Sequence, residues 1–168
     1  RCSKVIGVSG QRGRTQLSTA AETIPTDSQR QVWALVRRAD QLRERGQYAE
    51  SETLFKQALA LAEASFGKDA PELVAVLNNH AILYKYSGQF DAGETLYRRA
   101  LELAVRHLGE DHPEIATIYH NLGGLDHARG RFAEAEPAAR RAVEIRQRAL
   151  DADHPGVTET QLAADLAA

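Results

Sequence analysis

Apolar residues recur along much of the chain at steps of three and four, the spacing that puts side chains on one face of an α-helix. Charged residues fill the other positions, as where Glu94 precedes Arg98 by four residues, an order that adds about 0.2–0.5 kcal/mol to a helix. We interpret these charged residues as a solvated outer face. The stretch after Gly88 shows the pattern most clearly, with apolar or small residues at Gly93, Leu96, Tyr97, Ala100, Leu103, Ala104 and Leu108.

The stretch before it, PELVAVLNNHAILYKYSG at 71–88, is apolar around more of its circumference. Leu73, Leu77 and Ala81 form one stripe, while Val76 and Leu83 lie on another. A helix that is apolar on two sides packs on two sides, as each helix of a stacked array must. Together the two stretches predict a helical hairpin with a glycine in its turn.

This hairpin pattern repeats every 42 residues. The connectors FGKDAPELV, LGEDHPEIA and LDADHPGVT begin at residues 66, 108 and 150. Other positions keep the same step: Gly46, Gly88 and Gly130; Tyr48, Phe90 and Phe132; Glu52, Glu94 and Glu136; Ala58, Ala100 and Ala142; Leu61, Leu103 and Ile145; Pro71, Pro113 and Pro155. So many positions in phase indicate a repeat protein.

The connector LGEDHPEIA could be an acid–histidine catalytic pair, half a metal site, or a boundary between helices. Asp111 and Glu114 have the spacing of a capping box, as do Asp69 and Glu72 one repeat earlier. Pro113 falls in the first turn, where its missing N–H costs little. We therefore predict a helix stop followed by a helix start, with the histidine beside the proline as the least constrained member.

On these residues the chain resembles tetratricopeptide repeat proteins, and its 42-residue step and connector are similar to those of kinesin light chains and their bacterial relatives. LNNHAILYKYSGQFDAGETLYRRALEL at 77–103 carries the resemblance most clearly. It implies an all-α fold, a right-handed superhelix of three helical hairpins plus a C-terminal helix. The expected organisation is an irregular lead-in or remnant of an upstream domain at 1–26 and a repeat domain at 27–168, divided into 27–68, 69–110, 111–152 and a single helix at 153–168.

Some positions depart from the family pattern. Gly93 stands where a helix-packing alanine is usual, and Gly123-Gly124 interrupts a predicted helix, at about 1 kcal/mol per glycine relative to alanine. Arg38 and His80 occupy a position where the family prefers leucine. We expect these departures to weaken individual helices.

Composition narrows the function classes. The net charge of −2 and pI near 6.3 give no basic excess for nucleic acid. There is one cysteine and no apolar run long enough to cross a membrane, which favours a cytoplasmic protein. The chain starts at Arg1 and has no methionine, so we expect its N-terminal part to be missing.

Motifs for catalysis are nearly absent. The sequence has no HExxH or GxSxG, and VIGVSGQRGRT at 5–15 departs from a phosphate loop because Val8 takes the first glycine's place and Arg14 follows Gly13. His112 and His154 share a repeat position with Ala70, which argues against a metal or catalytic role. We predict no enzyme activity, no metal and no cofactor.

Binding is the function that remains. In the family that the chain resembles, the first helices of successive hairpins line a concave groove, and an asparagine there commonly grips a peptide backbone; Asn79 and Asn121 hold that position. Kinesin-light-chain-like repeats take acidic, tryptophan-bearing peptides, and the expected groove is mildly cationic and partly aromatic. The groove residues that we predict are Arg37, Asn78, Asn79, Lys85, Tyr86, His120, Asn121 and His127.

The leading hypothesis is therefore a non-catalytic scaffold that binds a protein or peptide segment, possibly acidic and aromatic, with no nucleic acid or membrane partner. The alternative is a regulatory repeat fragment of a larger signalling ATPase or protease. The last predicted helix has no partner helix, so its apolar face also invites self-association.

Overall fold

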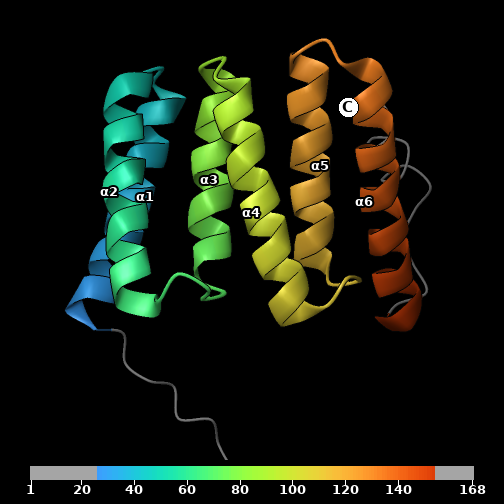
Figure 1. Cartoon of the computed structure of the whole chain (residues 1–168), viewed down its shortest axis with the longest axis horizontal. Coiled ribbons are helices and arrows are strands. Elements are labelled where there is room, and N and C mark those ends of the chain that lie inside the picture. The colour runs from blue at the N-terminus through green and yellow to red at the C-terminus, as the bar shows by residue number, and fades with distance from the viewer. Residues whose placement is uncertain (1–25, 154–168) are drawn as a thin grey trace, which may run out of the picture.

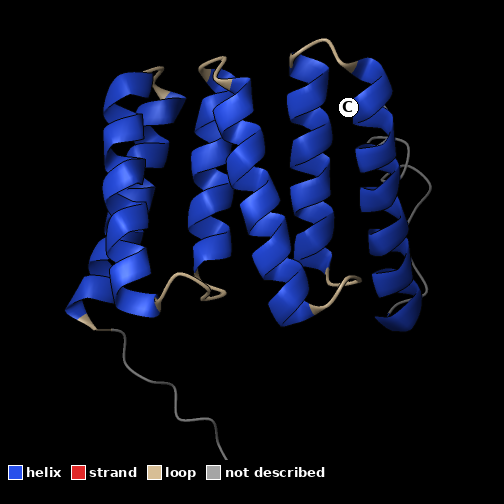
Figure 2. Ribbon diagram, in the orientation of Figure 1, coloured by secondary structure: helices blue, strands red, loops and turns tan. Residues whose placement is uncertain are grey.

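The apolar periodicity of the sequence appears as six α-helices in the computed structural model, which describes residues 26–153. No strand occurs among these residues (Figure 2). The lead-in at 1–26 and the single helix at 153–168 lie almost wholly outside them. The helices are α1 (Asp27–Glu44), α2 (Tyr48–Phe66), α3 (Leu73–Tyr86), α4 (Phe90–Leu108), α5 (Pro113–Ala128) and α6 (Phe132–Asp153).

Consecutive helices pair as three antiparallel hairpins, α1 with α2, α3 with α4 and α5 with α6, and the hairpins stand in a row (Figure 1). The turn within each hairpin ends at a glycine with positive φ: Gly46 at 75°, Gly88 at 76° and Gly130 at 80°. A residue with a Cβ atom rarely adopts this conformation, which explains why the glycine recurs. The all-α repeat fold with three hairpins is confirmed.

The first helices of the hairpins lie closer together than the second helices do. α1 contacts α3, and α3 contacts α5, whereas the second helices of neighbouring hairpins have at most sparse backbone contact with each other. A row that is tighter along one side curves toward that side. The faces of α1, α3 and α5 that point away from the second helices therefore line the inner side of the array.

Two glycines mark places where helices approach each other closely. A Cβ atom on Gly93 of α4 would lie 3.0 Å from Leu125 Cδ1 and 3.3 Å from the Ala81 carbonyl oxygen. A Cβ atom on Gly123 would lie 3.2 Å from the Ala135 carbonyl oxygen of α6, and α5 runs through this glycine without a break. Besides any cost to their own helices, Gly93 and Gly123 therefore permit the close packing of α4 and of α6.

The connectors are helix boundaries, but the capping prediction is wrong at both. At the start of α5 the N-cap is His112, whose Nδ1 accepts a hydrogen bond from the Glu114 N–H at 3.2 Å. Asp111 instead accepts from Arg148 of α6 at 2.9 Å. At the start of α3 the N-cap is Glu72, which makes no side-chain capping bond. The histidine that seemed least constrained is thus the residue that caps α5.

Acidic residues on the second helices also connect neighbouring hairpins. Glu52 pairs with Lys56 at 2.7 Å, as the four-residue spacing predicts, and it also accepts from Tyr84 Oη at 3.2 Å. Glu94 pairs with Arg98 and accepts from Arg129 Nη1 at 3.0 Å. These two carboxylates are therefore not only a solvated face, because each one links its hairpin to the next.

Candidate binding groove

The predicted groove residues all lie on first helices. Arg37 is on α1, Asn78, Asn79, Lys85 and Tyr86 are on α3, and His120, Asn121 and His127 are on α5. Within α3 and α5 they are either adjacent or six to eight residues apart, which is about two helical turns, so within each helix they share a broad face. The structure brings five of them together in two groups, and a sixth residue, Arg43, joins the second group.

The first group is an amide cluster formed by Asn78, Asn79 and Asn121, all half-buried. Asn121 Nδ2 of α5 donates to Asn78 Oδ1 of α3 at 2.8 Å. Asn78 Nδ2 in turn donates to Asn79 Oδ1 at 3.4 Å. The amide cluster therefore joins the second and third hairpins on the inner side of the array.

These bonds leave part of the amide cluster's capacity unused. Asn79 Nδ2 and Asn121 Oδ1 have no hydrogen-bond partner among residues 26–153. An amide group both donates and accepts, and a peptide bond offers one C=O and one N–H. The cluster thus presents one donor and one acceptor, the pair that a bound peptide backbone requires.

The second group is a cationic cluster formed by Arg43, Lys85 and Tyr86. Arg43 Cζ of α1 lies 5.5 Å from the centre of the Tyr86 ring, and Lys85 Nζ lies 5.4 Å from it. Both distances are in the range of cation–π interactions. Tyr86 is 56% exposed, so the cluster is accessible.

The two cations of this cluster differ in their ion pairing. Arg43 Nε lies 3.3 Å from Asp40 Oδ1, and Arg43 Nη2 lies 3.7 Å from Glu44 Oε1. Lys85 has no carboxylate partner within the described chain, and Gly124 of α5 leaves open space beside its Nζ. Lys85 is therefore the cation of this cluster that is free to pair with an acidic ligand.

The remaining predicted residues join neither cluster. Arg37 is exposed on α1, and His120 is half-buried on α5. His127 packs edge-on against Phe132 at the turn into α6, with the ring centres 5.0 Å apart. Val36, which shares the repeat position of Asn78 and His120, is 5% exposed and belongs to the core rather than to the groove.

The structure buries His80, a polar side chain that sequence periodicity did not single out as buried. His80 is 3% exposed, stacked on Phe55 and tilted against Tyr84, and neither ring nitrogen has a hydrogen-bond partner. Burial lowers the pKa of His80 to about 4, so the ring is neutral at pH 7. The Tyr97 hydroxyl is also buried without a partner, and burial raises its pKa. His80's place at a leucine position was the one signal of this.

Within residues 26–153, no three His, Cys, Asp or Glu side chains are grouped so as to hold a metal ion. None of the described helices is long and apolar enough to cross a membrane.

Comparison with known proteins agrees with the resemblance read from the sequence. The family model described as Tetratricopeptide repeat matches residues 30–104, 73–148 and 114–164. A search of curated proteins gives no significant match. Among solved structures the fold is similar to that of BtubC (BKLC) from P. vanneervenii, with a TM-score of 0.71 and 23% sequence identity. The similarity covers 86% of this chain but only 56% of BtubC. The recognition as a kinesin-light-chain-like repeat fold is confirmed.

Proposed function

Because the chain belongs to the tetratricopeptide repeat family, whose repeats generally mediate protein–protein interactions, we propose that it binds an extended peptide segment of a partner protein along the inner faces of α1, α3 and α5. The observation that carries the proposal is the free donor and acceptor of the amide cluster, Asn79 Nδ2 and Asn121 Oδ1. They come from neighbouring hairpins, so one peptide bound to both would span the second and third hairpins.

The ligand's chemistry follows from the cationic cluster. Lys85 has no carboxylate partner among the described residues, and the exposed Tyr86 ring offers an aromatic surface beside it. A peptide with an acidic residue near an aromatic or aliphatic one would pair with both. We expect an acidic, aromatic segment to bind better than a basic one. The proposed role is that of a non-catalytic scaffold in the cytoplasm, with no nucleic acid or membrane partner.

Isothermal titration calorimetry with a tryptophan-bearing acidic peptide, and with its lysine-substituted counterpart, tests the groove. A hydrogen bond contributes about 0.5–1.5 kcal/mol, so the double variant Asn79→Ala with Asn121→Ala should bind the acidic peptide about 5- to 150-fold more weakly. Gln57→Ala, which removes an exposed amide from α2, is the matched control and should bind normally. Equal affinities for the double variant and the unaltered protein would remove the groove proposal.

The charge preference has its own variant. Lys85→Glu should reverse the order of the acidic and basic peptides while leaving the helix intact, because position 85 is in the last turn of α3 and only half-buried. If Lys85→Glu leaves the order of the two peptides unchanged, the acidic preference is wrong, whatever the amide variants show.

A further inference from the structure

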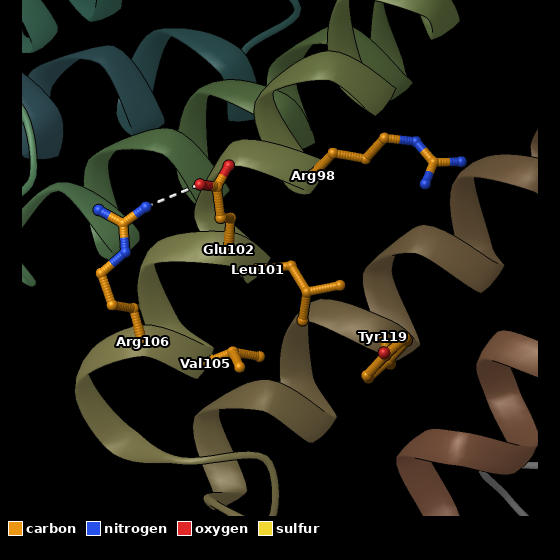
Figure 3. A pocket seen from close by; sticks show the side chains of 6 residues that line it. All are labelled: Arg98, Leu101, Glu102, Val105, Arg106 and Tyr119. Atoms are coloured by element: carbon orange, nitrogen blue, oxygen red, sulfur yellow. Dashed lines mark hydrogen bonds and ion pairs between the residues drawn. The ribbon is translucent and has the colours of Figure 1, made fainter.

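The outer side of the array holds an apolar cavity of about 460 Å³ where α4 meets α5. Leu101 and Val105 of α4 and Tyr119 of α5, all half-buried, form its apolar wall, and Figure 3 shows their side chains around one space. On α5, Tyr119 lies roughly opposite the groove stripe of His120 and Asn121 by helical geometry. The cavity is therefore separate from the amide and cationic clusters.

The same place one repeat earlier is constructed differently. Forty-two residues before Val105 stands Glu63, whose Oε1 pairs with Arg99 Nη1 at 2.7 Å and so ties α2 to α4. Forty-two residues before Tyr119 stands Leu77, which is fully buried. The first seam between hairpins is thus closed by an ion pair over a buried leucine.

The second seam lacks that closure. Val105 cannot form an ion pair, and Arg141, the counterpart of Arg99, lies 3.3 Å from Glu144 of its own helix and 3.9 Å from Asp111 of the connector. Tyr119 is correspondingly half-exposed. The departure from the repeat exchanges an ion pair for accessible apolar surface at one seam, which suits a docking site rather than the stack itself.

Charge at the rim indicates what would dock. Arg98 and Arg106 flank the apolar wall at 71% and 49% side-chain exposure, against one acid, Glu102. Arg98 pairs with Glu94 at 2.7 Å, and Arg106 pairs with Glu102 at 2.7 Å and with Asp69 of the connector before α3 at 3.2 Å (Figure 3 shows the pair of Arg106 and Glu102). Ion pairs between exposed side chains contribute little, so a partner's carboxylates can replace them at small cost.

The shape of the site favours a helix. The residues of α4 that line it, at positions 98, 101, 102, 105 and 106, follow the spacing of one helical face over about 12 Å. A straight stripe of this kind is complementary to about two turns of another helix, whose side chains interlock with it.

We propose that this outer seam binds an amphipathic helical segment of a partner protein, with an apolar anchor against Leu101, Val105 and Tyr119 and acidic residues facing Arg98 and Arg106. The contact is small, which corresponds to a weak, reversible interaction. It does not depend on the inner groove, so a partner could occupy both sides of the array.

Methyl-labelled protein observed by NMR provides the test, with a synthetic amphipathic helix of about 14 residues as the probe, one version with glutamates on its polar edge and one with lysines. The Leu101 and Val105 methyl signals and the Tyr119 ring signals should shift and saturate with the acidic probe, and the basic probe should bind at least about fivefold more weakly. Equal binding of the two probes, or shifts confined to other residues, would overturn the proposal.

Val105→Glu restores the residue of the first seam and should weaken binding of the acidic probe at least about tenfold. Ala64→Glu, which adds the same charge to an exposed site on α2, is the matched control and should bind normally; far-UV circular dichroism verifies that both variants fold. The Asn79→Ala, Asn121→Ala variant should also bind normally, which separates this proposal from the groove. Shifts of the same signals with protein concentration alone would identify a second copy as the occupant and refute the proposal.

Discussion

His80 lies in the core at a position where its two ring nitrogens have no partner, so replacing it with leucine should stabilise the protein. Leaving a polar group buried without a hydrogen bond costs about 1–3 kcal/mol, and leucine has a similar volume and no polar atom. We expect His80→Leu to raise the free energy of unfolding by about 1–3 kcal/mol at pH 7.5.

The effect should grow as the pH falls, because the neutral ring is the form that fits the core. Burial sets the pKa of His80 at about 4 in the folded protein, against 6.5 when the ring is solvated. A depressed folded pKa means that the stability is complete above pH 6.5 and is lost progressively as the pH falls toward 4. One pKa unit corresponds to about 1.4 kcal/mol, so the native protein should lose about 2 kcal/mol from this group by pH 5, and about 3 kcal/mol at the acid limit.

Nearby carboxylates titrate at lower pH and leave this window clear. The Glu52 and Glu94 pKa values lie below 4.5, chiefly because Lys56 and Arg98 donate hydrogen bonds to them, so their contributions are lost only in more acidic solution. Burial raises the pKa values of Asp40 and Asp126, but both carboxylates are present in His80→Leu and in the unaltered protein, so the difference between the two proteins isolates the histidine.

Urea denaturation of both proteins at pH 7.5, 6 and 5 provides the measurement. Circular dichroism follows all the helices, and fluorescence of the single tryptophan, Trp33, follows the first hairpin, so coincident transitions show that unfolding is all-or-none. His127→Gln changes an exposed histidine and should show no comparable pH-dependent difference from the unaltered protein. A stability difference between His80→Leu and the unaltered protein that stays constant from pH 7.5 to 5 would refute the reasoning.

Three further sets of variants test helix packing, an ion-pair link between hairpins and a helix cap. Gly93→Ala should destabilise the protein by about 1–3 kcal/mol, because the new Cβ would lie 3.0 Å from Leu125 Cδ1. Gly124→Ala should stabilise it by up to about 1 kcal/mol, because the new Cβ would meet only the flexible end of Lys85. Thermal melts compare the two variants, and stability changes in the same direction would contradict the packing argument. Arg129 pairs with Glu94 and Asp91 of the preceding hairpin, and only 14% of its side chain is exposed. Arg129→Ala should therefore lower the free energy of unfolding by about 1–3 kcal/mol in urea denaturation, and Arg129→Lys should lower it less. A loss for Arg129→Ala no larger than that of an exposed ion pair would contradict its role as a link between hairpins. His112→Ala should lower the free energy of unfolding by about 0.5–2 kcal/mol in the same measurement, because it removes the cap of α5. His112→Asn should lower it much less, since an asparagine side chain also caps helices. Equal losses for the two variants would show that the cap contributes nothing to stability.

The repeat unit and its helices could be predicted from sequence because they depend on local spacing. Apolar residues at helical steps and a turn glycine every 42 residues determine the hairpins, and the positive φ of Gly46, Gly88 and Gly130 follows from the same turn chemistry. The groove stripe was predicted from the family resemblance, which implies a groove along the first helices, and Asn79 and Asn121 keep one position in successive units.

What spacing could not supply is the contact between residues far apart in the chain. The bond between Asn121 and Asn78 depends on how two hairpins stack, and so does the convergence of Arg43 and Lys85 on one ring. The capping error has the same origin: Asp111 has the right spacing for a cap, but Arg148 of α6 draws it away and His112 takes its place.

The sequence alone therefore determined the all-α repeat and its hairpin boundaries, because each depends on a periodicity that one helix expresses by itself. Only the tertiary structure decided that His80 is buried without a partner, that Gly93 gives room for Leu125, and that one outer seam is closed by Glu63 while the next is open at Val105. In an array of near-identical units, the differences between seams arise where side chains of separate hairpins meet, and that meeting is fixed by packing rather than by the repeat.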